Sequence, residues 1–261
     1  MAALTLALGI GANTAIFTAI DALLLQSLPF PQSDRLVRLY ATSNGVPLPG
    51  LAGPSPPDVR DFAQASESFE HLVVYDVWRK NVSFGGAGAE PEQMRVGLVP
   101  GAYFETLEMR PIVGRLFTDD EGREGRNYVA AISARLWQTR FAGDRGILGR
   151  SLRINDELYT IVAVMPDVIP EWMESGRAGR IDVWTPLAFS TWWLETARGS
   201  RGGTSTLARL KPGVSLEQAQ ADLSAIAARL AATHEADRNI GVVIRRLADT
   251  RIGTLGPCSC C

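Results

Sequence analysis

Hydrophobic and polar positions divide the chain into a short apolar segment and a long mixed one. Residues 2–20 carry no charged side chain, and residues 22–30 extend this run past Asp21 with four leucines. A helix of about twenty such residues is long enough to cross the roughly 30 Å hydrocarbon core of a membrane. Pro29 and Pro31 then end any helix. The pattern predicts a transmembrane helix over residues 2–28.

Two other interpretations of this segment stay open. A cleaved signal peptide usually has a positively charged start and a small-x-small cleavage site, and the segment shows neither convincingly. A buried core helix is usually shorter and has a polar face. Small residues recur here at every fourth position, which lets a second helix approach closely in lipid, although an alanine-rich helix also gives such a stripe by chance. These positions are Ala7, Gly11, Ala15 and Ala19.

The mixed part begins with a strand, a helix and a second strand. Residues 36–40 alternate between apolar and polar, and a turn-rich loop follows to residue 54. Ser55 can cap a helix that opens on two prolines, and Val59, Phe62 and Ala63 give this helix an apolar face. Residues 69–78 then form an apolar stretch typical of a strand.

The same order returns more than a hundred residues later. Residues 204–210 predict a strand, residues 211–213 a turn, and residues 240–247 a closing strand. Between them, the Ser215 to Gln218 spacing is a capping box for a helix that continues to about residue 232 with an apolar stripe. Two such units predict a split α+β domain whose halves, residues 34–84 and 200–250, pair in space.

The intervening residues 85–190 predict an inserted, mainly-β lobe. Strands are expected at 93–99, 129–132, 151–154, 158–165 and 182–187. A short helix is expected at 101–107, and a second begins at Ser133 and stops at Gly143. Residues 251–261 form a tail. The expected fold class is therefore α+β, with an N-terminal transmembrane helix, a split βαβ lobe and an insertion.

Composition and charge exclude two broad classes of protein. The chain has 261 residues, of which 46% are hydrophobic and 21% charged, as expected for a chain that folds. Its 26 basic and 28 acidic residues give a net charge of −2, and the basic residues form no cluster. Because nucleic-acid binding normally requires a basic surface, we expect no nucleic-acid partner.

Residues that could carry catalysis or bind a metal are few. His71 and His234 lie on opposite halves of the chain, and the acidic run 119–121 lacks the alternating spacing of a calcium loop. Neither lysine follows a phosphate-binding glycine loop, and no Gly-x-Ser-x-Gly elbow occurs, so a hydrolase has little support. We expect no enzyme activity, no cofactor, and no catalytic or metal site.

Cysteines and tryptophans are concentrated in the second half of the chain. The cysteines lie in the last four residues, where they cannot staple a fold together and where a terminal or artificial sequence is the simplest explanation; they are Cys258, Cys260 and Cys261. Four tryptophans could either form an exposed apolar patch for a partner or lipid, or pack inside the inserted lobe: Trp172, Trp184, Trp192 and Trp193.

Several segments together resemble one protein family. Residues 6–17, followed by 28–31 and 34–39, look like the first membrane helix and its exit in MacB/FtsX-type ABC transporter permeases, in particular a duplicated bacterial subgroup. Residues 114–117, 132–141, 148–152 and 159–166 look like the MacB-like periplasmic core domain of that family. The resemblance covers almost the whole chain, but nothing after Leu255 resembles the remaining membrane helices.

The resemblance implies a location and a role. It implies a domain outside the bacterial cytoplasmic (inner) membrane, in the periplasm, with a porter-like α/β lobe and an inserted mainly-β lobe. The expected partners are a separate ABC ATPase subunit, the remaining permease helices, a second permease copy in a dimer, a periplasmic protein and membrane lipid. The domain would relay ATP-driven motion during export, with Pro29 and Pro31 as the hinge. The alternative is a membrane-anchored binding or adaptor domain without transport activity.

Overall fold

The computed structural model describes residues 28–48, 52–85, 90–167, 180–188, 197–201 and 204–250. Within these ranges, no helix is long and apolar enough to cross a membrane. The predicted membrane helix, apart from Leu28, lies outside the described residues, and so do its four small residues, Ala7, Gly11, Ala15 and Ala19. The tail of residues 251–261 also lies outside them.

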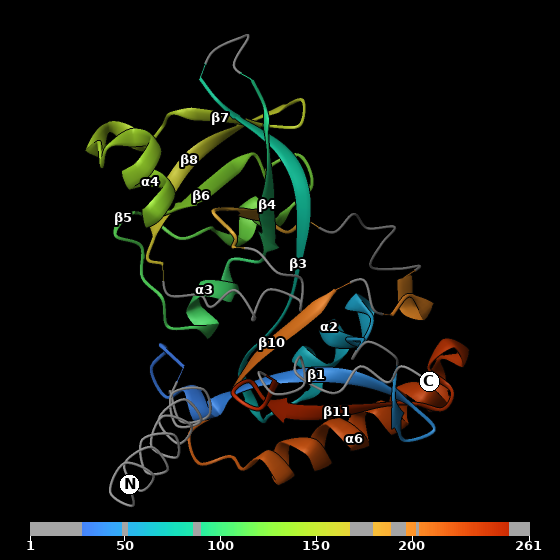
Figure 1. The fold of residues 1–261 in the computed structure, drawn as a ribbon. Helices are drawn as coiled ribbons and strands as arrows, with labels where there is room; N and C mark the ends of the chain where they lie inside the picture. Colours follow the sequence, from blue (N-terminus) through green and yellow to red (C-terminus); the bar gives the residue numbers. More distant parts are fainter. Residues whose placement is uncertain are drawn as a thin grey trace, which may run out of the picture.

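A lower lobe, named for its place in Figure 1, is built on an antiparallel sheet in the order β11-β1-β10-β3. Its strands are β1 (Leu36–Ser43), β10 (Ser205–Leu210), β11 (Ile240–Arg246) and the first half of β3 (Phe69–Phe84). The short β2 (Val46–Pro47) folds back on β1. Strands from the two ends of the described chain therefore pair directly in one sheet.

Two capped helices cover one face of this sheet. Helix α6 (Leu216–Thr233) begins with the predicted capping box between Ser215 and Gln218. Helix α2 (Pro56–Ala65) begins at the predicted cap, Ser55, which also forms a capping box with Asp58. Their buried residues form a core with β1, β10 and β11, including Phe62, Ala219, Leu223 and Ile226. Ala63 is exposed, so its assignment to the apolar face was wrong.

An upper lobe contains the remaining strands and two short helices (Figure 1). Its strands are β4 (Glu92–Val99), β5 (Val113–Gly114), β6 (Val129–Ser133), β7 (Ser151–Ile154), β8 (Glu157–Met165) and β9 (Val183–Pro186). Its helices are α3 (Ala102–Thr106) and α4 (Ala134–Phe141). The β4–β9 and β6–β8 pairs are parallel, whereas β7 and β8 form the predicted antiparallel hairpin.

Strand β3 belongs to both lobes and runs from one to the other in Figure 1. Its residues up to Tyr75 pair with β10 of the lower lobe, and its residues from Asp76 onward pair with β4 and β7 of the upper lobe. The sequence indicated a strand only to Trp78, whereas β3 continues to Phe84. The predicted insertion, 85–190, therefore starts after a strand whose second half already lies in the upper lobe.

A single hydrophobic core spans the contact between the lobes. It contains Leu36, Tyr75 and Leu207 from the lower lobe and a group of aromatic residues from the upper lobe, namely Tyr103, Phe104, Phe117 and Trp184. Trp184 is only 2% exposed, so it is part of the core and of no surface patch. Trp172, Trp192 and Trp193 lie outside the described residues. The two lobes are thus packed against each other through shared apolar surface.

Candidate functional site at the junction of the lobes

The segment from Leu28 to Arg35, here called the join, leads from the predicted membrane helix into β1. Leu28 and Phe30 are buried in the core that both lobes share. Pro29 and Pro31, the predicted hinge, lie between and beside them and are exposed. Because two apolar side chains alternate with prolines, the start of the join is fixed both by its restricted backbone and by burial of Leu28 and Phe30.

Arg209 of β10 ties the join to the upper lobe. Its Nε donates a hydrogen bond to the Thr106 carbonyl oxygen at 2.7 Å, at the end of α3. Its Nη1 donates to the Pro31 carbonyl at 3.1 Å and lies 3.0 Å from the Glu108 carboxylate. A longer contact of 3.4 Å reaches the Gln32 carbonyl. One guanidinium, carried by β10 of the lower lobe, therefore contacts both the upper lobe and the join.

The charge of Arg209 lies in the interior. The residue is 1% exposed, and burial lowers the pKa of its guanidinium below the usual range for arginine, because desolvation outweighs the attraction of Glu108. Arginine nevertheless stays protonated in proteins. A buried charge is stable only while its hydrogen bonds are kept. Moving the join, β10 or α3 away from the others would leave the buried guanidinium of Arg209 without partners and destabilise the fold.

Arg35 holds the other end of the join. Its Nε donates to the Leu210 carbonyl at 2.8 Å, and its guanidinium pairs with Glu70 of β3 at 2.5 Å. It also donates to the side-chain oxygen of Gln32 within the join. The join is therefore bonded to two strands of the lower sheet before β1 begins.

A second charged group fixes the return path from the upper to the lower lobe. Arg198 and Arg201 belong to residues 197–201, which precede β10. Both pair with Asp58 at the start of α2 and with Asp237 in the 3₁₀ turn Glu235–Asp237. Burial raises the pKa of Asp58, an effect that Asp237 reinforces and that the Ser55 hydrogen bond and the two arginines oppose. All the partners lie in the lower lobe, so this group clamps the connection to that lobe alone.

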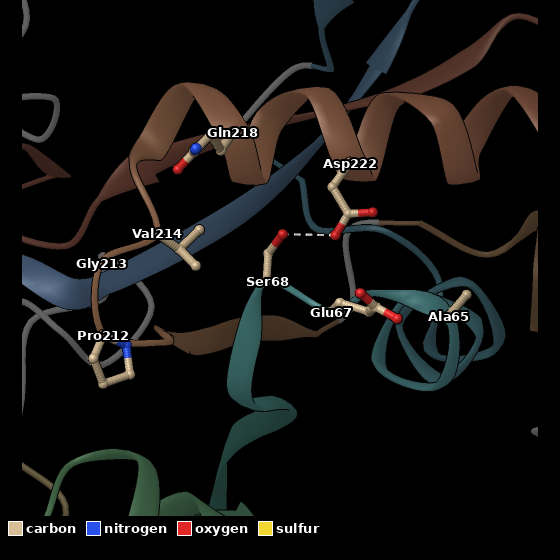
Figure 2. A pocket seen from close by; sticks show the side chains of 8 residues that line it. All are labelled: Ala65, Glu67, Ser68, Pro212, Gly213, Val214, Gln218 and Asp222. Carbon is tan, nitrogen blue, oxygen red and sulfur yellow. Dashed lines mark hydrogen bonds between the residues drawn. The ribbon is translucent and has the colours of Figure 1, made fainter.

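An open groove of about 570 Å³ lies on the lower lobe between the end of α2 and the start of α6. Figure 2 shows the Ser68 hydroxyl pointing at the Asp222 carboxylate on α6, to which it donates at 2.7 Å. Ser66 donates to the same oxygen. Burial alone would raise the pKa of Asp222, but these donors outweigh it and lower the pKa. The carboxylate thus joins two elements, which accounts for its position in the groove.

The other residues singled out from the sequence are dispersed. His71 lies on β3 and His234 at the end of α6, in separate elements. In the acidic run, Glu121 pairs with Arg115 and Asp120 pairs with Arg126. Across the part of the chain that the structure describes, no group of three acidic, histidine or cysteine residues could hold a metal ion. Cys258, Cys260 and Cys261 lie outside that part.

Arg209 was not among the residues that the sequence suggested. It lies in a run of alternating residues, where an arginine is expected to face water. The available signal was the prediction that residues 34–84 and 200–250 pair in space, since a strand in the middle of such a sheet, covered on both faces, buries even its polar positions. Arg209 shares a face with Leu207, which packs in the interlobe core, whereas Ala208 and Leu210 pack towards α6.

This fold occurs in extracytoplasmic domains of permeases. A domain of a protein described as a permease, from Porphyromonas gingivalis, superposes with a TM-score of 0.59 at 18% identity, over 84% of this chain and 93% of that one. The periplasmic region of MacB from Actinobacillus actinomycetemcomitans gives 0.58 at 15% identity, over 85% and 93%. The extracellular domain of the noncanonic ABC-type transporter YknZ from Gram-positive bacteria gives 0.52 at 14%, over 80% and 99%.

The sequence itself places the chain within one family. Residues 1–226 match the MacB-like periplasmic core domain, and the chain belongs to this family. The resemblance to MacB/FtsX-type permeases is thereby confirmed, as is the mixed α+β fold class. No curated protein matches the chain significantly.

Proposed function

We propose that this chain is the extracytoplasmic core domain of an ABC-type export permease of the bacterial inner membrane. In this proposal residues 2–28 cross the membrane, and the domain relays ATP-driven motion of the membrane helices to a substrate or partner outside. The proposal keeps the predicted division into a split lobe, residues 34–84 and 200–250, and an inserted lobe, residues 85–190, except that β3 from Asp76 to Phe84 belongs to the upper lobe. The domain itself catalyses no reaction. Family membership supports the location, and the contacts of the join support the relay.

The observation that carries the relay is the bonding of Arg209. A flexible linker would let the membrane helix move without moving the domain. Here Leu28 and Phe30, at the end of the predicted helix and just after it, are buried in the interlobe core, and the Pro31 carbonyl is bonded through Arg209 to α3 of the upper lobe. A displacement of Leu28 or Phe30 must therefore move both lobes or break buried contacts, and protein interiors are too densely packed to absorb it.

The proposal assigns the energy source to other chains. The domain would act with a separate ABC ATPase subunit, the remaining permease helices and a second permease copy. Substrate or a periplasmic protein would contact its outer surface, while lipid surrounds the membrane helix. Nucleic acid has no place in this scheme, since the basic residues form no cluster.

The test compares two buried arginines in a transporter assembled from the permease containing this domain and its ATPase. Arg209→Met keeps the aliphatic bulk of the side chain but removes the bonds to Thr106 and Pro31. The control, Arg201→Met, removes a guanidinium whose side chain is 9% exposed and whose partners all lie in the lower lobe. Transport and ATP hydrolysis are measured together in proteoliposomes.

The proposal expects Arg209→Met to lower the substrate moved per ATP, while Arg201→Met leaves this ratio unchanged even if it reduces stability as much. The reason is that Arg209 bonds the join to the upper lobe, whereas the partners of Arg201 lie in the lower lobe. An equal fall in the ratio for both variants, or no fall for Arg209→Met, would contradict the relay and favour an adaptor domain.

A further inference from the structure

Strand β11 is the outermost strand of the lower sheet among the described residues. The Asn44 amide donates to the Asn239 carbonyl, and the Leu247 amide donates to the Leu36 carbonyl, so odd-numbered residues of this segment face β1. Since backbone groups alternate along a strand, those of Val242 and Ile244 point away from β1. Such an edge offers pairing groups to a strand of another molecule.

Gln220 of α6 occupies the centre of this edge. Its Nε2 donates to the Val242 carbonyl oxygen at 2.9 Å, and its Oε1 accepts from the Ile244 amide at 2.9 Å. A second Nε2 hydrogen goes to the Ser224 hydroxyl at 3.0 Å. Exchanging the amide oxygen and nitrogen would place two acceptors together at Val242 and two donors together at Ile244. The surrounding groups therefore fix the orientation of the amide.

The side chain of Gln220 takes the place of a peptide group in a neighbouring strand. In a parallel pair, one residue donates to the carbonyl of residue i and accepts from the amide of residue i+2. Gln220 makes the same two bonds with Val242 and Ile244 from a helix, which cannot extend the sheet further. A side-chain amide thus occupies two of the outward backbone groups that an added strand would need.

We propose that Gln220 guards the edge of β11 against strand addition, and that the partner it excludes is a second copy of this chain. Two copies carry the same edge, and antiparallel pairing of two identical edges closes around a twofold axis. The inference is independent of the proposed function, because it concerns only the β11 edge, which it keeps from pairing with a second copy of the chain.

The test uses the full 261-residue chain in detergent micelles and two variants of Gln220. Gln220→Met keeps the length of the side chain and removes both bonds. Gln220→Glu at neutral pH keeps an acceptor for Ile244 but has no donor for Val242. The control is Arg229→Ala, an exposed position on the same helix. Self-association is measured by sedimentation velocity over a range of protein concentrations, and hydrogen–deuterium exchange is measured on peptides covering residues 240–247.

In the Gln220→Met variant, the amide hydrogen of Ile244 should exchange with solvent about fivefold faster than in the native chain, as expected for the loss of one hydrogen bond. This variant should also form a dimer whose amount rises with concentration, while Arg229→Ala keeps the native sedimentation. Gln220→Glu should keep Ile244 protected and associate less than the Met variant.

Unchanged sedimentation of a folded Gln220→Met variant would overturn the proposal, even with faster exchange, because Gln220 would then only tether α6 to β11. If the Gln220→Met variant does not fold, the sedimentation of the Gln220→Glu variant tests the proposal instead. Association above the native level supports a guard, and native sedimentation overturns it.

Discussion

Replacing Phe30 by alanine tests whether the join is part of the folded core. Phe30 is 5% exposed and packs in the core that both lobes share. Truncating a buried phenylalanine to alanine costs about 3–5 kcal/mol, which combines lost transfer free energy with the cavity left behind. The exposed prolines on either side allow some collapse around the site, so we expect a value near the lower limit, about 3 kcal/mol.

The assay is thermal and denaturant unfolding of the full chain in detergent. For a domain of this size, about 3 kcal/mol corresponds to a fall in Tm of roughly 6–12 °C. Val46→Ala is the control, because Val46 is 66% exposed and its truncation should change the stability by at most about 0.5 kcal/mol. The slope of the denaturant transition should be unchanged, since the same surface is exposed on unfolding.

One result would refute the reasoning. If Phe30→Ala unfolds at the same temperature as the native chain and Val46→Ala, the join is a tether that contributes nothing to the core. The packing that supports the relay would then be absent in solution.

Three further predictions concern the hinge, the groove and nucleotide. Replacing Pro29 and Pro31 by glycine in the complete transporter should lower transport more than ATP hydrolysis, because glycine frees the backbone of the join; equal losses would count against a hinge. Replacing Ser66 and Ser68 by alanine should raise the pKa of Asp222, measured by NMR titration of its carboxyl group. Because this pKa lies below the ordinary 3.8, Asp222 stabilises the fold at neutral pH. That contribution should be lost as the pH falls through the folded-state pKa, so the stability difference between the native chain and Asp222→Asn should vanish in acid. Finally, the purified chain should neither bind nor hydrolyse ATP, which calorimetry and phosphate release can check.

Local signals in the sequence predicted most of the elements. Ser55 caps α2 as expected, and Ser215 starts α6 with the capping box that its spacing to Gln218 indicated. Ser133 caps α4, which ends at Phe141, just before the expected stop. These features depend on residues within one turn of each other, and tertiary packing has little influence on them.

Features that depend on contacts between residues far apart in the sequence could not be predicted from such local signals. Strand β3 continues through the polar run Arg79 to Asn81 because β4 pairs with this run and β7 pairs with the residues that follow it, from Val82 to Phe84. This pairing is invisible locally. The burial of Arg209 depends on α3 and on the join, about a hundred and more residues away in sequence. The search for catalytic and metal-binding residue types did not point to the junction of the lobes, because there the backbone carbonyls of Thr106 and Pro31 accept hydrogen bonds from Arg209.

The pairing of β1 with late strands predicts an order of folding during synthesis. Apart from the short β2, strand β1 pairs with β10 and β11, which emerge more than 160 residues after it. The upper lobe contains only strands that are complete by residue 186. We therefore expect the upper lobe to fold first while β1 waits unpaired, as is usual when long-range contacts must close large loops. A chaperone that shields apolar strands would be needed most in that interval, which ends when β11 arrives.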